Sequence, residues 1–278
     1  MPIYVVADLH GAAEDLKEAV PEGSTLLLLG DLINFLDYMT MTGILTEVFS
    51  IETVTEVVEL RTAGKVEEAR RVMRSRSEGR EEEIRNEIGV RVTKQYEDVF
   101  AALPDPTFLI LGNVDNPLLA EAFAAGTPGT TLVTAGSFEL EGERFGLAGG
   151  ALPTPLGVAG EIPPDELRSR IDSLGEVDVV CTHIPPAVPE LCFDTVSGKR
   201  EQGSEDLLEY IRDVQPRRAY FGHVHQPLVS VTTVGRTLCV NVGYFRATRR
   251  AFPHAAPSQP AGRTMDRPGD PRREGESL

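Results

Sequence analysis

The chain opens with Ile3-Tyr4-Val5-Val6-Ala7-Asp8-Leu9-His10-Gly11. The first five of these residues are mostly β-branched, aromatic or otherwise apolar, which predicts a short buried strand. Asp8 and His10 follow at once, so we expect their side chains at the carboxyl end of that strand. In open α/β sheets, ligands bind outside the carboxyl ends of the strands. This stretch therefore predicts an α/β fold whose site is built from residues at strand ends.

The same arrangement recurs four more times along the chain. Apolar runs that end in a residue able to bind a metal occur at 25–29 before Asp31, 107–111 before Asn113, 177–181 before His183, and 218–221 before His223. Loops placed at random would not put such a residue after five separate strands. We expect these side chains to meet at one edge of the fold.

A helical insertion is expected between the second and third of these strands, at about 36–103. Its apolar side chains recur at helical spacing, and a charge-rich stretch follows in which Glu and Arg alternate at i, i+3 and i+4. We favour a solvated helix for that stretch, while a lid over the site and a contact between copies in a homo-oligomer remain alternatives. Residues 1–248 are expected to form the domain that carries the site.

The second half of the chain is rich in strand signals. We expect strands at 131–135, 137–140 and 144–148 with a turn at 141–143, a helix at 164–174, and closing strands at 228–234 and 237–242. The Pro-rich tail at 249–278 is expected to be disordered. Arg246, Arg249 and Arg250 are expected to form an exposed basic patch, with contact to a phosphate as the alternative.

The composition describes an acidic protein. Lys and Arg number 27 against 43 Asp and Glu, for a formal charge of −16 over 278 residues. This charge disfavours long nucleic acids and anionic membranes as partners, except where the basic insert or tail offers a local track. No run reaches the ~18 apolar residues of a membrane span, and no signal peptide is recognised, so we expect a soluble, cytoplasmic protein. Three cysteines without C-x-x-C spacing predict neither disulfides nor a thiolate metal site.

The strand ends supply seven candidate metal ligands, all with oxygen or nitrogen donors. They are Asp8, His10, Asp31, Asn113, His183, His223 and His225. Such a mixture suits Mn²⁺, Fe or Zn²⁺ better than Ca²⁺. Seven ligands exceed the roughly three protein ligands of one catalytic zinc. Two metals that share a carboxylate would use the whole set, and of the five histidines only His254 would be left without a role.

These residues resemble the signature of the calcineurin-like metallophosphoesterases. That signature reads DxH, GD, GNH followed by Asp or Glu, a lone His, and GHxH. The chain carries the five blocks in this order: Asp8-Leu9-His10, Gly30-Asp31, Gly112-Asn113-Val114-Asp115, His183, and Gly222-His223-Val224-His225. The resemblance implies two central mixed β-sheets sandwiched by helices, with the helical insert as an addition.

The resemblance also implies how the site works. Asp8, His10 and His225 would bind one metal, Asn113, His183 and His223 the other, and Asp31 would bridge the two. With two divalent ions, Mn favoured over Fe or Zn, a metal-bridging hydroxide would attack the phosphorus of a small phosphoester. Asp31, Asn113 and His183 would be catalytic residues, and Asn113 and His183 would also contact the substrate.

Val114 departs from the signature, because many family members carry the His of GNH at this position. That His acts on the leaving group, and the loss of a general acid typically costs about 10²- to 10⁴-fold in rate. The departure resembles a phosphodiesterase subgroup, so we expect diesters with good leaving groups to be preferred over alkyl monoesters. Asp115, which orients the missing His in the family, is expected to hydrogen-bond the loop backbone. A non-catalytic binding or scaffold protein on the same fold is the alternative.

Overall fold

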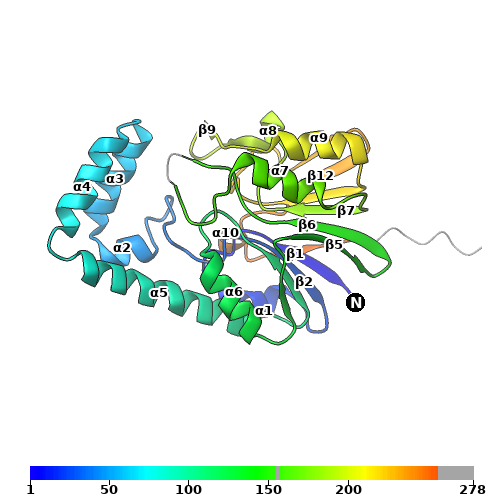
Figure 1. The fold of residues 1–278 in the computed structure, drawn as a ribbon, viewed down its shortest axis with the longest axis horizontal. Helices are drawn as coiled ribbons and strands as arrows, with labels where there is room; N and C mark the ends of the chain where they lie inside the picture. The colour runs from blue at the N-terminus through cyan, green and yellow to red at the C-terminus, as the bar shows by residue number, and fades with distance from the viewer. Residues whose placement is uncertain (155–156, 256–278) are drawn as a thin grey trace, which may run out of the picture.

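Two mixed β-sheets stack face to face in the computed structural model, which describes residues 1–154 and 157–255 (Figure 1). The first sheet has the order β13 (Phe252–Pro253), β1 (Ile3–Val6), β2 (Thr25–Leu29), β3 (Thr107–Ile110) and β4 (Thr130–Leu132). The second has the order β11 (Val231–Val234), β12 (Thr237–Asn241), β10 (Arg218–Phe221), β7 (Val179–Thr182), β6 (Glu143–Ala148) and β5 (Ala135–Leu140). A separate small hairpin joins β8 (Phe193–Asp194) to β9 (Lys199–Arg200).

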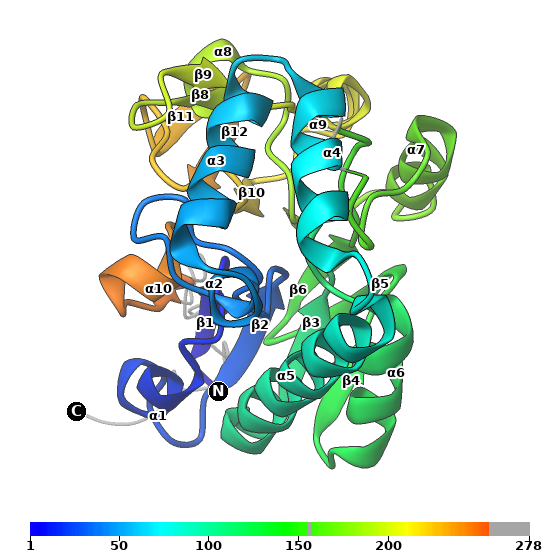
Figure 2. The same cartoon turned by 90° about the vertical axis from the view of Figure 1, so that its left-hand side faces the viewer.

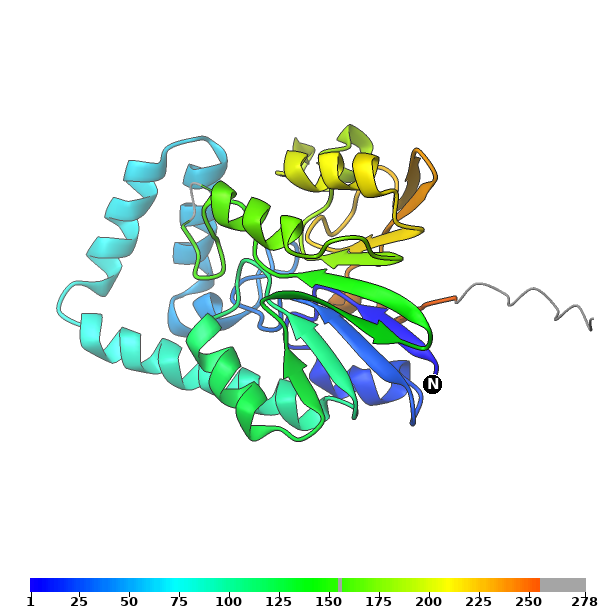
Figure 3. The ribbon, with the colours of Figure 1, turned by 45° about the vertical axis from the view of Figure 1, so that its right-hand side comes forward.

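Helices cover the outer face of each sheet (Figure 3). The first sheet is covered by η1 (Ala13–Asp15), α1 (Leu16–Ala19), α5 (Glu81–Ala102) and α6 (Pro117–Gly126). The second is covered by α7 (Pro164–Asp172), α8 (Pro189–Cys192) and α9 (Glu205–Val214). The expected α/β fold of two central sheets between helices is thus confirmed. None of the helices in the described ranges is long and apolar enough to cross a membrane.

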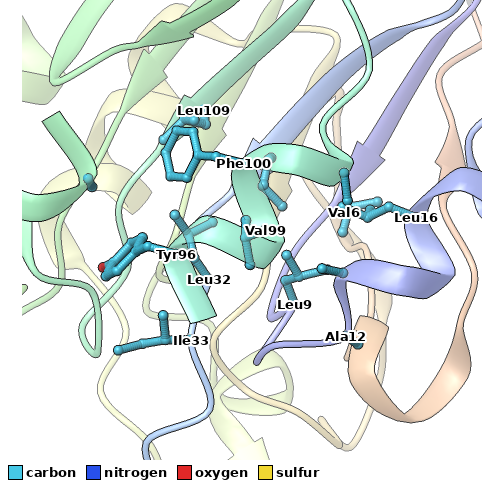
Figure 4. Close-up of a cluster of buried hydrophobic side chains, with 14 of the residues drawn as sticks. Val6, Leu9, Ala12, Leu16, Leu32, Ile33, Tyr96, Val99, Phe100 and Leu109 are labelled. Atoms are coloured by element: carbon cyan, nitrogen blue, oxygen red, sulfur yellow. The ribbon is translucent and has the colours of Figure 1, made fainter. Parts of the chain in front are cut away.

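The core explains the apolar runs of the sequence. All five residues of β2 are buried, because this parallel strand lies between a helical layer on one face and the second sheet on the other. Figure 4 shows the helical side of this core, where Phe100 of α5 lies beside Leu109 of β3, and Tyr96 and Val99 of α5 belong to the same cluster. The central strands are thus packed on both faces. Because the strands are fixed, the positions at which the loops leave them are fixed as well.

Helices occupy the segment between β2 and β3. They are α2 (Ile44–Val48), α3 (Ile51–Thr62), α4 (Val66–Ser77) and α5. The hairpin of α3 and α4 projects from the body, on the side toward which the central strands point (Figures 1 and 2). Within α4 only Ala69 is buried, whereas the second half of α5 belongs to the core. The end of α5 therefore anchors the segment, and the hairpin is largely solvated.

The structure corrects two expectations about strands. The stretch expected as one strand at 131–135 is split, because β4 pairs with β3 in the first sheet and β5 begins in the second. The expected disordered tail contributes β13, in which Phe252 pairs with Val5 and Pro253 with Tyr4. Helices α6 and α9 had no counterpart among the expected elements. The rest of the expected tail, 256–278, lies outside the described residues.

His254 also belongs to the fold. Its Nδ1 lies 3.0 Å from the hydroxyl of Tyr220, and its Nε2 lies 3.0 Å from Oε2 of Glu143. These contacts fasten the end of β13 to the second sheet. The histidine that the motifs left over thus has a structural position away from the strand-end residues.

Candidate metal centre

The carboxyl ends of five strands meet at one edge of the stack. β1, β2 and β3 are parallel in the first sheet, as β7 and β10 are in the second. The loops after these strands carry all seven expected ligands: Asp8, His10, Asp31, Asn113, His183, His223 and His225. Asp8, Asp31 and His183 are buried with 3% exposure or less. Side chains from both sheets therefore converge in one enclosed cluster.

Four of these residues form a compact donor set, which we call the first set. One donor atom from each of Asp8, His10, Asp31 and His225 lies within 4.8 Å of the others. The Nε2 atoms of His10 and His225 are 3.1 Å apart, and Nε2 of His10 lies 3.5 Å from Oδ2 of Asp31. Four oxygen and nitrogen donors at this spacing suit one divalent metal.

Asp31, Asn113, His183 and His223 form the second set. Oδ1 of Asn113 lies 3.0 Å from Nε2 of His183 and 3.0 Å from Nδ1 of His223. Nε2 of His183 also lies 3.5 Å from Oδ1 of Asp31. Asp31 therefore turns one carboxylate oxygen toward His183 and the other toward His10. Its position between the sets is that of a residue able to bridge two metals.

Backbone carbonyls orient two of the imidazoles. Nδ1 of His10 lies 3.1 Å from the carbonyl oxygen of Ile33, and Nδ1 of His183 lies 2.8 Å from that of Leu29. A proton on Nδ1 that is donated to a carbonyl leaves the lone pair of Nε2 free. Both rings thus present to the cluster the nitrogen that a metal requires.

The backbone is strained where it leaves the strands. Four candidate ligands have a positive φ: Asp8 (55°), His10 (41°), Asp31 (53°) and His223 (68°). This conformation costs a residue with a side chain roughly 1–2 kcal/mol, and such strain clusters at functional sites. The chain is also closely packed here, because a Cβ on Gly112 would lie 2.2 Å from Oδ1 of Asp31. The glycine of the third motif block is therefore required by space.

Burial dominates the electrostatics of the cluster. It raises the pKa of Asp31 to about 7, and together with the charge of Asp31 it raises the pKa of Asp8 well above its usual value. Burial lowers the pKa of His183 and His225 to about 4, so both imidazoles are neutral at pH 7. Neutral imidazoles and carboxylates are the protonation states that bind metals, and two dications would balance the buried negative charge. The residues present therefore fit a pair of divalent metals.

Asp115 holds together the loops of the second and third strands. Its carboxylate accepts hydrogen bonds from the backbone N–H groups of Asp31 (2.9 Å), Leu32 (2.8 Å) and Gly112 (2.8 Å). The expectation that Asp115 binds loop backbone is confirmed. Val114 donates its own N–H to Oδ1 of Asp31 at 3.1 Å, and its side chain packs on the core that covers the first sheet. This position thus offers a backbone donor and an apolar side chain.

Three further residues lie beside the cluster: Asp37 and Tyr244, which no sequence pattern indicated, and Arg246, which was expected in an exposed basic patch. The ring of Tyr244 stacks on the imidazole of His225, and Arg246 donates a hydrogen bond to the carbonyl of His10 at 2.7 Å. Arg246 is therefore part of the surroundings of the site, not of an exposed basic patch. No motif signals these contacts, because the hydroxyl of Tyr244 meets Asp37 across 207 residues of sequence.

One solved structure shares the fold, and others are similar at lower TM-scores. One crystal structure matches 88% of this chain and 92% of its own, at 19% identity and a TM-score of 0.52. An archaeal phosphodiesterase matches 89% of this chain and 87% of its own, at 14% identity and a TM-score of 0.36. A purple acid phosphatase from yellow lupin (Lupinus luteus) seeds matches 94% of this chain and 46% of its own, at 14% identity and a TM-score of 0.42. Among curated proteins, none is similar enough in sequence to count as a match.

The sequence also matches a family model, that of the calcineurin-like phosphoesterases, over residues 1–227. The matched region begins before β1 and ends just after His225, so it contains every strand end that contributes to the cluster. Fold, donor residues and family model agree over most of the chain. The protein belongs to the calcineurin-like phosphoesterase family.

Proposed function

We propose that the protein is a phosphodiesterase that works with two divalent metals, Mn²⁺ in preference to Fe or Zn²⁺. Membership of the calcineurin-like phosphoesterases supports the coarser statement, that of a metal-dependent phosphoesterase. The observation that carries the proposal is the position of Asp31, whose Oδ2 faces His10 and whose Oδ1 faces His183, each at 3.5 Å. A carboxylate with one oxygen toward each of two donor sets is suited to bridging.

The two sets would hold the metals. Asp8, His10 and His225 would bind one ion, Asn113, His183 and His223 the other, and Asp31 both. When bound as a pair, the ions would lower the pKa of a water between them and stabilise the charge of the phosphoryl group. The backbone N–H of Val114 donates to Oδ1 of Asp31 and helps to hold that carboxylate in the orientation that bridging would require. Asn113 and His183, on the second set, are the residues proposed to contact the phosphoryl oxygens.

The proposed preference for diesters rests on the resemblance of the Val114 departure to a phosphodiesterase subgroup, while Val114 by itself favours esters whose leaving groups need no proton. Its side chain cannot donate a proton to a departing alkoxide, and Asp115 is occupied by three backbone N–H groups. Alkyl monoesters, whose leaving groups need protonation, should therefore react slowly. Diesters with acidic leaving groups need no such proton and should react fastest.

The test is hydrolysis of an aryl phosphodiester and of the matching monoester by metal-stripped protein. Mn²⁺, Mg²⁺ or Zn²⁺ is added back, and Asp31→Asn serves as the inactive control. We expect metal-restored turnover that favours the diester and is absent in the variant. Equal turnover of both esters would overturn the diesterase assignment while leaving a phosphoesterase. Stoichiometric metal binding without turnover of any ester would favour the alternative function, that of a non-catalytic binding or scaffold protein on this fold, in which the loss of the histidine at position 114 has no catalytic consequence.

A further inference from the structure

His225 is held differently from His10 and His183. Its side chain is 32% exposed, against 7% for His10. The rings of His10 and His183 are fixed by backbone carbonyls, whereas no hydrogen bond involves Nδ1 of His225 within residues 1–154 and 157–255. A metal-binding imidazole usually has such a partner, which sets the orientation of the ring. Another contact must therefore orient His225.

Tyr244, which precedes α10 (Phe245–Thr248), supplies a contact of the right shape. Its ring lies parallel to the imidazole of His225, with 3.9 Å between centroids and 6° between planes. The same ring meets His10 edge-on, with centroids 5.5 Å apart and planes at 86°. One buried aromatic ring thus forms a wall against both imidazoles of the first set. A flat ring at this distance restricts rotation of the His225 imidazole out of the parallel orientation.

The ring of Tyr244 is held in place through its hydroxyl group. The hydroxyl of Tyr244 donates to Oδ2 of Asp37 at 3.2 Å. Burial opposes the charge of Asp37, but hydrogen bonds from Met39, Thr40 and Tyr244 outweigh it and hold the pKa of Asp37 below its usual value. A charged acceptor forms the stronger hydrogen bond. Tyr244 is therefore fixed at its hydroxyl end as well as at its ring.

Arg246 links Asp37 to His10. Its Nε lies 3.6 Å from Oδ2 of Asp37, and its Nη1 donates to the carbonyl oxygen of His10 at 2.7 Å. Asp37 belongs to the loop at the start of the helical segment, whereas Arg246 and Tyr244 come from the end of the domain. The contacts therefore join the base of the insert to the first donor set through His10 and His225.

We propose that Tyr244, anchored by Asp37 and Arg246, is the positioning residue that orients His225 as a ligand of the first donor set. The inference rests on the proposed function, because it assumes that this set binds a metal. If Tyr244 only filled space, any apolar side chain of similar size would replace it. If it orients His225, a flat ring is required at this position.

The experiment compares metal binding by Tyr244→Phe and Tyr244→Leu with that of the wild type. Metal-stripped protein is titrated with Mn²⁺ by calorimetry and with Co²⁺ by visible absorption, which reports the geometry around the ion. We expect two ions in the wild type. Tyr244→Leu should lose about 10- to 100-fold in affinity for one ion and change its Co²⁺ spectrum, as is typical when the residue that orients a ligand is removed. Tyr244→Phe keeps the ring but loses the hydrogen bond to Asp37, so it should keep both ions and the Co²⁺ spectrum and lose much less affinity than Tyr244→Leu.

Two controls identify the affected ion and the role of general packing. His225→Ala removes the ligand itself, so its binding curve shows which ion Tyr244→Leu should weaken. Tyr210→Leu alters another buried tyrosine, which lies on α9, a helix that covers the second sheet. The hydroxyl of Tyr210 donates to the carbonyl of Gly175. Tyr210→Leu should leave both ions unchanged. Should Tyr244→Leu fail to fold, Tyr244→Met, a flexible side chain that fills irregular space, takes its place with the same expectation.

Two outcomes would overturn the inference while leaving the proposed function intact. One is a Tyr244→Leu protein that binds two ions as tightly as the wild type. The other is an equal loss in Tyr244→Phe and Tyr244→Leu, which would assign the effect to the hydroxyl. A wild type that binds no metal would overturn both the inference and the proposed function.

Discussion

The strand-end cluster and the α3–α4 hairpin lie on the same side of the molecule, but they are built in opposite ways. In the cluster, His10 meets His225 across 215 residues of sequence, four of the seven side chains are buried, and the backbone is strained. In the hairpin, ion pairs such as Lys65–Glu68 and Glu67–Arg70 join residues three apart and remain exposed. A buried polar atom without its partner is costly, whereas an exposed ion pair contributes little. Replacement of a single atom in the cluster should therefore change activity or stability strongly, whereas most substitutions in the hairpin should change neither.

The largest effect is expected from Asp31→Asn. Loss of the shared carboxylate removes several kcal/mol of charge stabilisation, so hydrolysis of an aryl phosphodiester should fall by about three orders of magnitude. Asp98→Asn, on the exposed face of α5, is the matched control and should keep full activity. Turnover by Asp31→Asn within tenfold of the wild type would contradict the expected difference between cluster and hairpin, because the cluster would then tolerate the loss of the carboxylate charge at its centre.

The same variant should change how stability depends on pH when metal is absent. In the folded protein the pKa of Asp31 is about 7, against a usual value of 3.8, so the folded state keeps a proton that the unfolded chain has lost between these pH values. The stability contributed by that proton is present below about pH 4 and is lost as the pH rises through 7.

Asparagine does not titrate, so Asp31→Asn should gain on the wild type by a few kcal/mol between pH 4 and 8, at about 1.4 kcal/mol per pKa unit. Urea unfolding of both proteins in the presence of a chelator measures this difference. Mn²⁺ should stabilise the wild type at pH 8 and reduce the gain. A difference that does not vary with pH would contradict the buried charge of the cluster.

Val114→His tests whether the cluster can gain a function. A histidine here supplies the missing proton donor, so turnover of an alkyl phosphomonoester should rise by about 10- to 100-fold, while the diester changes little. This rise is at or below the lower end of the ~10²- to 10⁴-fold that a general acid typically contributes. The reason is that Asp115 already binds three backbone N–H groups and is not free to orient the new ring. Val114→Leu is the control for size. An equal rise for monoester and diester would mean that the valine does not set the preference.

Tyr96→Phe probes the junction where the helical segment joins the body. The hydroxyl of Tyr96, on α5, accepts the backbone N–H of Asn116 at 2.7 Å. Loss of the acceptor leaves this N–H without its partner, which should lower the free energy of unfolding by about 1–3 kcal/mol. Tyr38→Phe, on the exposed loop before α2, should cost much less in the same urea titration, and an equal cost would remove the distinction between junction and surface.

The smallest effect is expected from Arg70→Ala on α4. The side chains of Arg70 and Glu67 are 57% and 77% exposed, so the loss of their ion pair should cost less than about 0.5 kcal/mol. Diester turnover should stay at the wild-type level. A clear drop in turnover at unchanged stability would instead make the hairpin part of the substrate site.

Much of the cluster was accessible from the sequence because its pieces are local. Each strand is followed at once by its polar residue, so the strand ends and the seven candidate ligands could be recognised from short motifs alone. The parallel arrangement of strands then brings those ends to one edge. The helices between β2 and β3 could be expected for the same reason, because their apolar periodicity is local.

What depends on contacts across the chain was decided only by the tertiary structure. β13 forms because Phe252 and Pro253 meet β1, and nothing in their own sequence indicates a strand. Strands β4 and β5 follow one another closely, yet the partners they find lie in different sheets.

The same holds around the candidate metals. The sequence by itself determined which residues end the strands, since the strand signal and the polar residue lie in one short segment. Only the tertiary structure decided that Tyr244 stacks on His225 and that Asp37 and Arg246 anchor it. The contacts of Asp37 with Tyr244 and Arg246 join segments some 200 residues apart, and the stack joins a strand-end loop to a turn beyond the next two strands. The position of a stacked ring is set by the packing of the whole domain, and no local pattern encodes it.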